Sequence, residues 1–148
     1  MVAGADVPVG MTGPVGMTGQ VERFFAGYCD AFNRSDAPAI ARYFAVPCLL
    51  VEEATTVWST GRDVLQAITR LLSFYAAQGF ETSDFKVERV LALDDGHVVA
   101  DIAWTIGRTG SRPAWRFRTA YNLRYAAGDW QIVCCTAYQE ARVRQHMG

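Results

Sequence analysis

The stretch of sequence that decides the fold runs from His97 to Tyr138 and reads HVVADIAWTIGRTGSRPAWRFRTAYNLRYAAGDWQIVCCTAY. Apolar and polar residues alternate along much of it, which is typical of β-strands that bury one face. One turn signal, Asp-Asp-Gly at 94–96, comes directly before this stretch, and another, Ala-Gly-Asp at 127–129, lies within it. With the residues just before it, the stretch predicts four antiparallel strands, near residues 82–94, 96–108, 113–126 and 129–141.

Two of these strands differ in how much of their surface is apolar. The strand near 113–126 has one apolar face, made by Trp115, Phe117, Thr119, Tyr121, Leu123 and Tyr125. The strand near 96–108 is largely apolar on both sides, with Val98, Ala100, Ile102, Trp104 and Ile106 opposite Val99, Asp101, Ala103 and Thr105. An apolar sheet face must be covered. We therefore expect one face to border the core and the outer face to form a homodimer interface.

Three helical segments and a short strand pair accompany these strands. The first helix is predicted over residues 20–34, where apolar residues recur at helical spacing: Val21, Phe24, Phe25, Tyr28 and Phe32. Asp36 then caps a second, short helix. Residues 46–53 and 55–59 are predicted to pair as strands, and a capping box at Thr60 opens a third helix over 62–77.

This order of elements favours an α+β fold, with three helices packed in the concave face of a strongly curved, mostly antiparallel sheet of about six strands. We expect a hollow between the helices and the sheet. The domain is predicted to span residues 20–141, followed by a tail at 142–148. Residues 1–19 contain the tandem repeat PVGMTG and are rich in Gly and Pro, which favours a flexible leader. The alternative for this segment is an arm that packs on a partner subunit.

Composition excludes several classes of function. The chain has 148 residues, the length of one domain, and its net charge of −1 gives no electrostatic footprint for nucleic acid. It contains no apolar run long enough for a membrane helix and no secretory signal at its start, so we expect no membrane partner and a cytoplasmic protein. Only two histidines are present, which argues against a histidine-based metal site, and we expect no cofactor.

The four cysteines, Cys29, Cys48, Cys134 and Cys135, have no Cys-x-x-Cys spacing. In a domain of this size they are expected to be small buried side chains and to stay reduced.

The element order, together with two segments of sequence, resembles the nuclear transport factor 2-like superfamily. These segments are YCDAFNRSD at 28–36 and YNLRYAAGDWQI at 121–132, and the resemblance covers roughly residues 20–138. It implies the cystatin-like cone fold, a half-barrel. The superfamily includes ketosteroid isomerases, SnoaL-like polyketide cyclases, dehydratases, epoxide hydrolases and proteins that only bind or assemble, so the resemblance marks the fold more sharply than the function.

The resemblance to ketosteroid isomerases implies roles for three residues. In that family a tyrosine of the first helix and a protonated aspartate of a late strand donate hydrogen bonds to the developing oxyanion, while an aspartate of the first strand transfers the proton. The matching positions here are Tyr28, Tyr121 and Glu52, respectively. The carboxylate is retained as glutamate, and the late-strand donor becomes a phenol, which still donates.

Each candidate residue also has a purely structural interpretation. Glu52 is either a desolvated general base at the mouth of an apolar cavity, or a structural carboxylate that is solvated at a strand end or paired with an arginine. Tyr28 is either an oxyanion donor or a core tyrosine. Asp101 is either a second pocket acid or the ion-pair partner of Arg116 or Arg118 across the ladder. The residues expected to contact a ligand are Phe25, Trp104, Trp115, Phe117, Leu123 and Asp101.

Two hypotheses of function follow. The first is a cofactor-independent enzyme of the isomerase, cyclase or dehydratase type, acting on a small apolar, carbonyl-bearing molecule such as a polyketide or terpene. Glu52 would then move a proton next to the carbonyl, and Tyr28 or Tyr121 would stabilise the enolate oxygen. The second is a non-catalytic ligand-binding or dimeric assembly domain. An open apolar cavity distinguishes the first hypothesis from an assembly domain with a filled interior.

Overall fold

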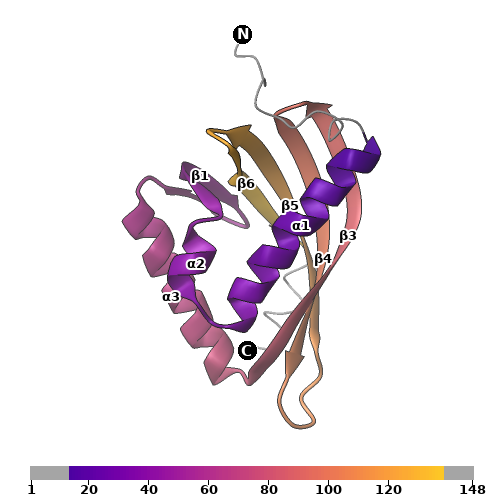
Figure 1. Cartoon of the computed structure of the whole chain (residues 1–148). Coiled ribbons are helices and arrows are strands. Elements are labelled where there is room, and N and C mark those ends of the chain that lie inside the picture. Colours follow the sequence, from indigo (N-terminus) through magenta and orange to yellow (C-terminus); the bar gives the residue numbers. More distant parts are fainter. Residues whose placement is uncertain (1–13, 139–148) are drawn as a thin grey trace.

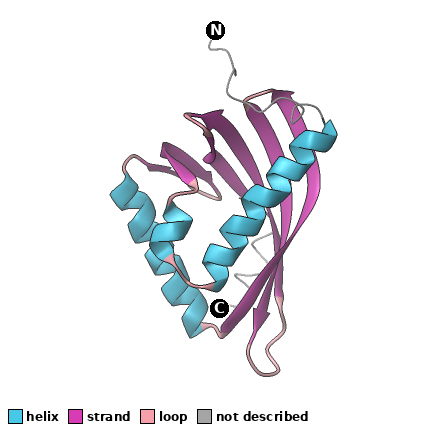
Figure 2. Ribbon diagram, in the orientation of Figure 1, coloured by secondary structure: helices cyan, strands magenta, loops and turns pink. Residues whose placement is uncertain are grey.

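The computed structural model describes residues 14–138. It confirms the predicted α+β class: three helices pack against one curved, mostly antiparallel sheet of six strands (Figure 1). Figure 2 shows the described helices on the concave side of the sheet. The helices are α1 (Pro14–Asn33), α2 (Ala37–Ala41) and α3 (Gly61–Ala77).

The sheet has the spatial order β2-β1-β6-β5-β4-β3. Its strands are β1 (Phe44–Val51), β2 (Thr55–Trp58), β3 (Phe80–Asp94), β4 (His97–Arg108), β5 (Trp115–Ala126) and β6 (Asp129–Tyr138). Strands β3 to β6 form the predicted meander, and β1 joins it by pairing parallel to β6. The long strands therefore build the curved wall, and the short β1–β2 hairpin closes one side of it.

The first helix begins earlier than its sequence predicts. Helix α1 starts at Pro14, six residues before the expected start at residue 20, so residues 14–19 are helical and not part of a flexible leader. Met17 lies four residues before Val21 on the same helix face, and both side chains are buried in the core. Proline is tolerated in a first helical turn, which lets the helix begin inside the repeat. Residues 1–13 lie outside the described residues.

The helix caps that the sequence predicts are present. The side chain of Asp36 accepts a hydrogen bond from the Ala39 amide at 3.1 Å and opens α2. At α3, the Thr60 hydroxyl accepts from the Asp63 amide, while the Asp63 carboxylate accepts from the Thr60 amide, both at 3.1 Å. These reciprocal bonds satisfy amides that have no partner within the helix.

A polar clasp joins α1 to the edge strand β3. The side-chain oxygen of Asn33 accepts from the Ser83 amide at 2.6 Å, and its nitrogen donates to the Ser83 carbonyl at 3.2 Å. The thiol of Cys29 donates to the same carbonyl at 3.2 Å. Because β3 lies at the edge of the sheet, the Asn33 amide takes the place of a neighbouring strand. The clasp fixes the end of α1 at a set distance from the sheet.

The chain's four cysteines are free, and Cys29, Cys48 and Cys135 are buried, as the sequence predicts, whereas Cys134 is half-buried. No helix within residues 14–138 combines the length and the apolar character needed to cross a membrane.

Candidate functional site

A cavity of about 350 Å³ lies between the concave face of the sheet, helices α1 and α3, and the β1–β2 hairpin. Most of its wall is apolar, including Phe32, Phe44, Leu50, Trp58, Ile68, Leu71, Ile106 and Phe117. Among its lining residues only Glu52 and Thr56 are exposed, and both belong to the β1–β2 hairpin region. The mouth of the cavity therefore lies beside this hairpin, and its inner end lies among buried aromatic side chains.

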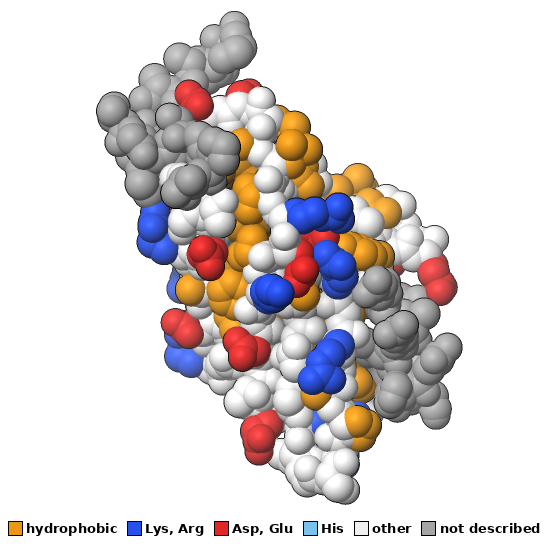
Figure 3. All heavy atoms as spheres, turned by 90° about the vertical axis from the view of Figure 1, so that its right-hand side faces the viewer, with side chains coloured by type: hydrophobic (Ala, Val, Ile, Leu, Met, Phe, Trp, Pro, Cys, Tyr) orange, Lys and Arg blue, Asp and Glu red, His pale blue; other side chains and the backbone are white. Residues whose placement is uncertain are grey.

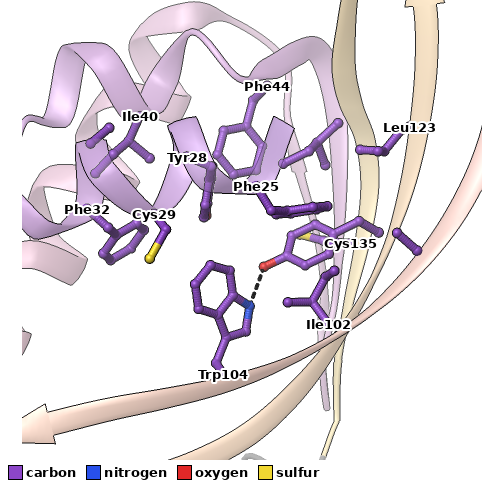
Figure 4. Close-up of a cluster of buried hydrophobic side chains, with 14 of the residues drawn as sticks. Phe25, Tyr28, Cys29, Phe32, Ile40, Phe44, Ile102, Trp104, Leu123 and Cys135 are labelled. Atoms are coloured by element: carbon purple, nitrogen blue, oxygen red, sulfur yellow. Dashed lines mark hydrogen bonds between the residues drawn. The ribbon is translucent and has the colours of Figure 1, made fainter. Parts of the chain in front are cut away.

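The inner wall carries a hydrogen-bonded pair of aromatic side chains. The indole nitrogen of Trp104 on β4 donates to the hydroxyl of Tyr121 on β5 at 3.0 Å (Figure 4). Tyr28 of α1 packs against both, with ring centroids 5.8 Å from Trp104 and 6.3 Å from Tyr121. The three residues all line the cavity. The Tyr121 oxygen accepts from the indole and keeps its own proton, so it is able to donate to a bound acceptor.

Both phenols are held in the neutral form. Burial raises the pKa of Tyr28 well above its ordinary value, and the neighbouring Tyr121 adds to the effect. Burial likewise raises the pKa of Tyr121, with a further contribution from Cys135, against the opposing hydrogen bonds of Trp104 and Thr119. A neutral phenol is a hydrogen-bond donor, so the inner end of the cavity presents donors to a ligand at physiological pH.

Glu52 lines the cavity but lies in an exposed position. Strand β1 ends at Val51, two residues before its predicted end, so Glu52 and Glu53 both lie in the turn before β2 rather than on a strand. The Glu52 amide donates to the Ala54 carbonyl at 3.1 Å within this turn. The burial on which a desolvated base depends is therefore not present.

Of the six residues expected to contact a ligand, the structure places Trp104 and Phe117 in the cavity wall. Phe25 and Leu123 are buried in the core outside the lining, and the ring of Phe25 packs against that of Tyr121 with centroids 4.7 Å apart. Trp115 is also outside the lining. Its ring stacks on Phe74 at 6.0 Å, and the guanidinium of Arg108 covers it at 4.4 Å. These three residues are buried side chains of the core and do not border the cavity.

Asp101 lies on the opposite face of the sheet, so the expectation that it contacts a ligand in this cavity is wrong. Its carboxylate accepts from Arg118 at 2.6 Å, from Arg89 at 3.0 Å and from the Tyr138 hydroxyl at 2.5 Å. The predicted ion pair with Arg118 is confirmed, whereas no ion pair links Asp101 to Arg116. Burial raises the pKa of Asp101, but the bonds from Tyr138 and Arg89 and the charge of Arg118 outweigh it and hold the pKa below its usual range.

The cavity also contains residues that sequence reasoning did not assign to it. The polar ones are Thr56, Ser83 and Thr119, and the others include Trp58, Ala67, Tyr75, Cys135 and Ala137. Ile68, Leu71 and Tyr75 belong to the apolar stripe of α3. Their helical spacing in the sequence is the signal that could have placed them on the face of the helix that borders the cavity. Within residues 14–138, no three His, Cys, Asp or Glu side chains gather into a potential metal site.

The curved sheet, its three covering helices and the cavity between them define the cystatin-like cone fold of nuclear transport factor 2-like proteins. A family model described as "NTF2-like protein (DUF6841)" matches residues 19–140. The chain belongs to this family, which confirms the resemblance seen in its sequence. A search of curated proteins gives no match.

Solved structures of low sequence identity share the fold. Aln2 from a Streptomyces species is 15% identical, with a TM-score of 0.72, and the match covers 91% of this chain and 98% of Aln2. A domain with a cystatin-like fold from Nostoc punctiforme is 12% identical, with a TM-score of 0.69 over 91% of this chain and 86% of that one. A ketosteroid isomerase-like protein from Erwinia carotovora is 21% identical, with a TM-score of 0.61 over 80% and 94%.

Proposed function

We propose that this protein binds a small, largely apolar, carbonyl-bearing molecule in the cavity and catalyses a cofactor-independent reaction of the isomerase, cyclase or dehydratase type. The observation that carries the proposal is the Trp104–Tyr121 hydrogen bond at the inner end of a mostly apolar cavity. An apolar wall with a few convergent polar groups is the usual character of a small-molecule site. Here the buried donors would hold the carbonyl oxygen of the ligand.

In the reaction, Glu52 takes a proton from the carbon next to the carbonyl, and the carbonyl oxygen gains the negative charge of the enolate. A hydrogen bond from Tyr121 or Tyr28 stabilises that oxygen, and Glu52 then returns the proton to the same carbon or to a conjugated one. The role of Glu52 is supported by its place on the cavity wall, where it is the only carboxylate among the described lining residues. Its exposed position means that a bound ligand must itself exclude water from the carboxylate.

The binding step is tested with a neutral aromatic ketone, acetylnaphthalene, titrated by isothermal calorimetry. We expect saturable binding by the wild-type protein and about tenfold weaker binding by Tyr121→Phe, because the variant loses a buried hydrogen bond to the carbonyl. Equal affinities for the two proteins would contradict the role of Tyr121. If the wild-type protein bound none of a panel of such ketones, the proposal would be overturned.

The chemical step is tested by exchange of the α-protons of enolisable ketones in deuterated water, followed by NMR. This assay needs no knowledge of the natural product, because any enolising enzyme catalyses it. We expect Glu52→Gln to slow exchange by roughly 100-fold or more. Glu53→Gln is the matched control, since Glu53 is its neighbour in the same turn and does not line the cavity. Near-normal exchange by Glu52→Gln removes Glu52 from the mechanism.

Assembly is a second candidate function, which one observation favours. Leu91 and Leu93 are 60% and 61% exposed at one end of β3, and Leu91 pairs with the half-buried Val99 on the outer face of the sheet. Hydrophobic side chains lie among charged ones on the side of the molecule shown in Figure 3. We propose that two copies associate through this outer face. Light scattering coupled to gel filtration tests it: wild type is expected as a dimer, and Leu91→Asp as a monomer.

A further inference from the structure

The indole of Trp104 is a hydrogen-bond donor that the fold holds in place. Trp104 is buried, and its ring packs against Tyr28 of α1 and Phe85 of β3, with centroids 5.8 and 5.9 Å away. The indole nitrogen lies 3.0 Å from the hydroxyl oxygen of Tyr121 (Figure 4). An indole N–H donates and never accepts, so the Tyr121 oxygen is the acceptor in this bond.

The Tyr121 hydroxyl therefore acts on a ligand mainly through its proton. A phenolic oxygen carries one proton and accepts through its lone pairs. The indole of Trp104 uses this accepting capacity, and the Thr119 hydroxyl is a further hydrogen-bond neighbour of the same oxygen. The ring of Tyr121 is itself buried and packs against Phe25, with centroids 4.7 Å apart. Both side chains of the Trp104–Tyr121 bond are thus held by packing, and the Tyr121 proton is directed away from the indole.

This hydrogen-bond polarity distinguishes a ketone from the corresponding alcohol. A carbonyl oxygen only accepts, so it matches the proton that Tyr121 presents. An alcohol oxygen also accepts, but its own proton needs an acceptor, and at Tyr121 that proton competes with the indole for the same oxygen. A hydroxyl that leaves water for a mostly apolar cavity without gaining an acceptor loses binding free energy. The ketone has no such proton and avoids this loss.

We propose that Trp104 is a positioning residue that sets the hydrogen-bond polarity of the inner end of the cavity: by donating to the Tyr121 oxygen, it makes the site bind carbonyl compounds in preference to the corresponding alcohols. This inference rests on the proposed function, because it requires that the cavity binds a carbonyl-bearing ligand. It deepens that function by fixing the oxidation level of the ligand. The class of reaction that supplies the substrate must then deliver a ketone or an aldehyde, and an alcohol precursor must be oxidised before it binds.

The experiment compares two probes of nearly equal size and shape, acetylnaphthalene and naphthylethanol. Calorimetry measures their affinities for wild type, Trp104→Phe and Trp58→Phe. In the wild type we expect the ketone to bind about tenfold more tightly than the alcohol. Trp104→Phe frees the Tyr121 oxygen to accept from the alcohol, so this ratio should fall to about twofold or less.

Trp58→Phe is the matched control, because it makes the same substitution in the same cavity wall. The ring of Trp58 packs edge-on against Phe44, with centroids 5.5 Å apart, and Trp58 takes no part in the Trp104–Tyr121 bond. A change in the shape of the wall alters the affinities for both probes together. Trp58→Phe should therefore keep the wild-type ratio of ketone to alcohol affinity, even where both affinities fall.

Infrared spectroscopy of the bound ketone, with an isotope-labelled carbonyl, supplies a readout that a merely structural role of Trp104 would not move. A phenol that accepts from an indole is polarised and donates more strongly. The carbonyl stretching band should therefore lie at lower wavenumber in wild type and Trp58→Phe than in Trp104→Phe.

Equal affinities of the wild type for ketone and alcohol overturn the inference, and this test stands even if Trp104→Phe does not fold. An unchanged ratio in a folded Trp104→Phe variant, or the same change in both variants, also overturns it. These results leave the proposed function intact as long as the ketone binds. Failure of the wild type to bind any such ketone overturns both the proposed function and this inference.

Discussion

The indole nitrogen of Trp104 lies 3.0 Å from the phenolic oxygen of Tyr121, although the two residues are not paired in the sheet. Trp104 pairs with Phe117 and Tyr121 pairs with Ala100, so the hydrogen bond runs diagonally across the β4–β5 ladder. The two long side chains lean toward each other over the concave face and meet Tyr28 of α1 there. This diagonal contact places a hydrogen-bonded indole and phenol in a cavity wall that is mostly apolar.

Removing the Tyr121 hydroxyl should cost stability as well as affinity. In Tyr121→Phe the buried indole N–H of Trp104 loses its acceptor, which costs roughly 1–3 kcal/mol of the free energy of unfolding. Urea unfolding measures this change. The companion variant Trp104→Phe/Tyr121→Phe removes both polar groups and should recover part of the loss. If Tyr121→Phe were as stable as wild type, the indole N–H would have found another acceptor, such as water.

Stability should depend on acid through Asp101. The folded pKa of this carboxyl lies below its unfolded value, because the partner bonds outweigh the effect of burial. Its stabilising contribution is therefore fully present above the unfolded pKa, about 3.9, and is lost as the pH falls through the folded value. Asp101→Asn should lose roughly 2–3 kcal/mol at neutral pH and should show a weaker decline of stability in acid. Urea unfolding at a series of pH values gives both quantities, and parallel curves for the two proteins would contradict the assignment.

Position 27 should tolerate only glycine, because the hydroxyl of Tyr43 occupies the space that a larger side chain would need. A Cβ atom at residue 27 would clash with this hydroxyl, and Tyr43 is itself packed edge-on against Phe24 and Tyr28. Gly27→Ala should therefore destabilise the protein by roughly 1–3 kcal/mol, despite the better helix propensity of alanine.

A double-mutant cycle isolates this clash. In the Tyr43→Phe background, where the hydroxyl is gone, Gly27→Ala should instead stabilise by roughly 0.5–1 kcal/mol through helix propensity. Thermal unfolding of the four proteins measures the cycle. The same effect of Gly27→Ala in both backgrounds would rule out the hydroxyl as the cause.

Met17 should contribute to the core although it lies in the segment that sequence analysis assigned to a leader. Its side chain is 1% exposed, so Met17→Ala should lower the free energy of unfolding by roughly 2–5 kcal/mol. Glu22→Ala, at an exposed position of the same helix, is the control and should stay within about 0.5 kcal/mol of wild type. Equal effects of the two substitutions would place the start of the ordered helix after residue 17.

Periodicity predicted the strands and helices well, because each element repeats its buried positions at a fixed spacing. It predicted the start of α1 poorly, since glycine and proline have low helix propensity, whereas the burial of Met17 in the core favours the helix. It also misplaced the end of β1 by two residues. Val51 pairs with Thr55 of β2 and with Thr136 of β6, and the turn between β1 and β2 follows directly. Local sequence alone does not specify where such a turn begins.

The candidate site was only partly predictable for a related reason. The sequence determined which side chains share the concave face, because alternation along a strand is a local property. It could not decide which of them border open space: Trp104 and Phe117 do, whereas Phe25, Leu123 and Trp115 do not. Nor could it decide that Glu52 is exposed. The position of a cavity depends on how far apart α1, α3 and the sheet are held, and that distance is set by long-range contacts such as the clasp between Asn33 and Ser83.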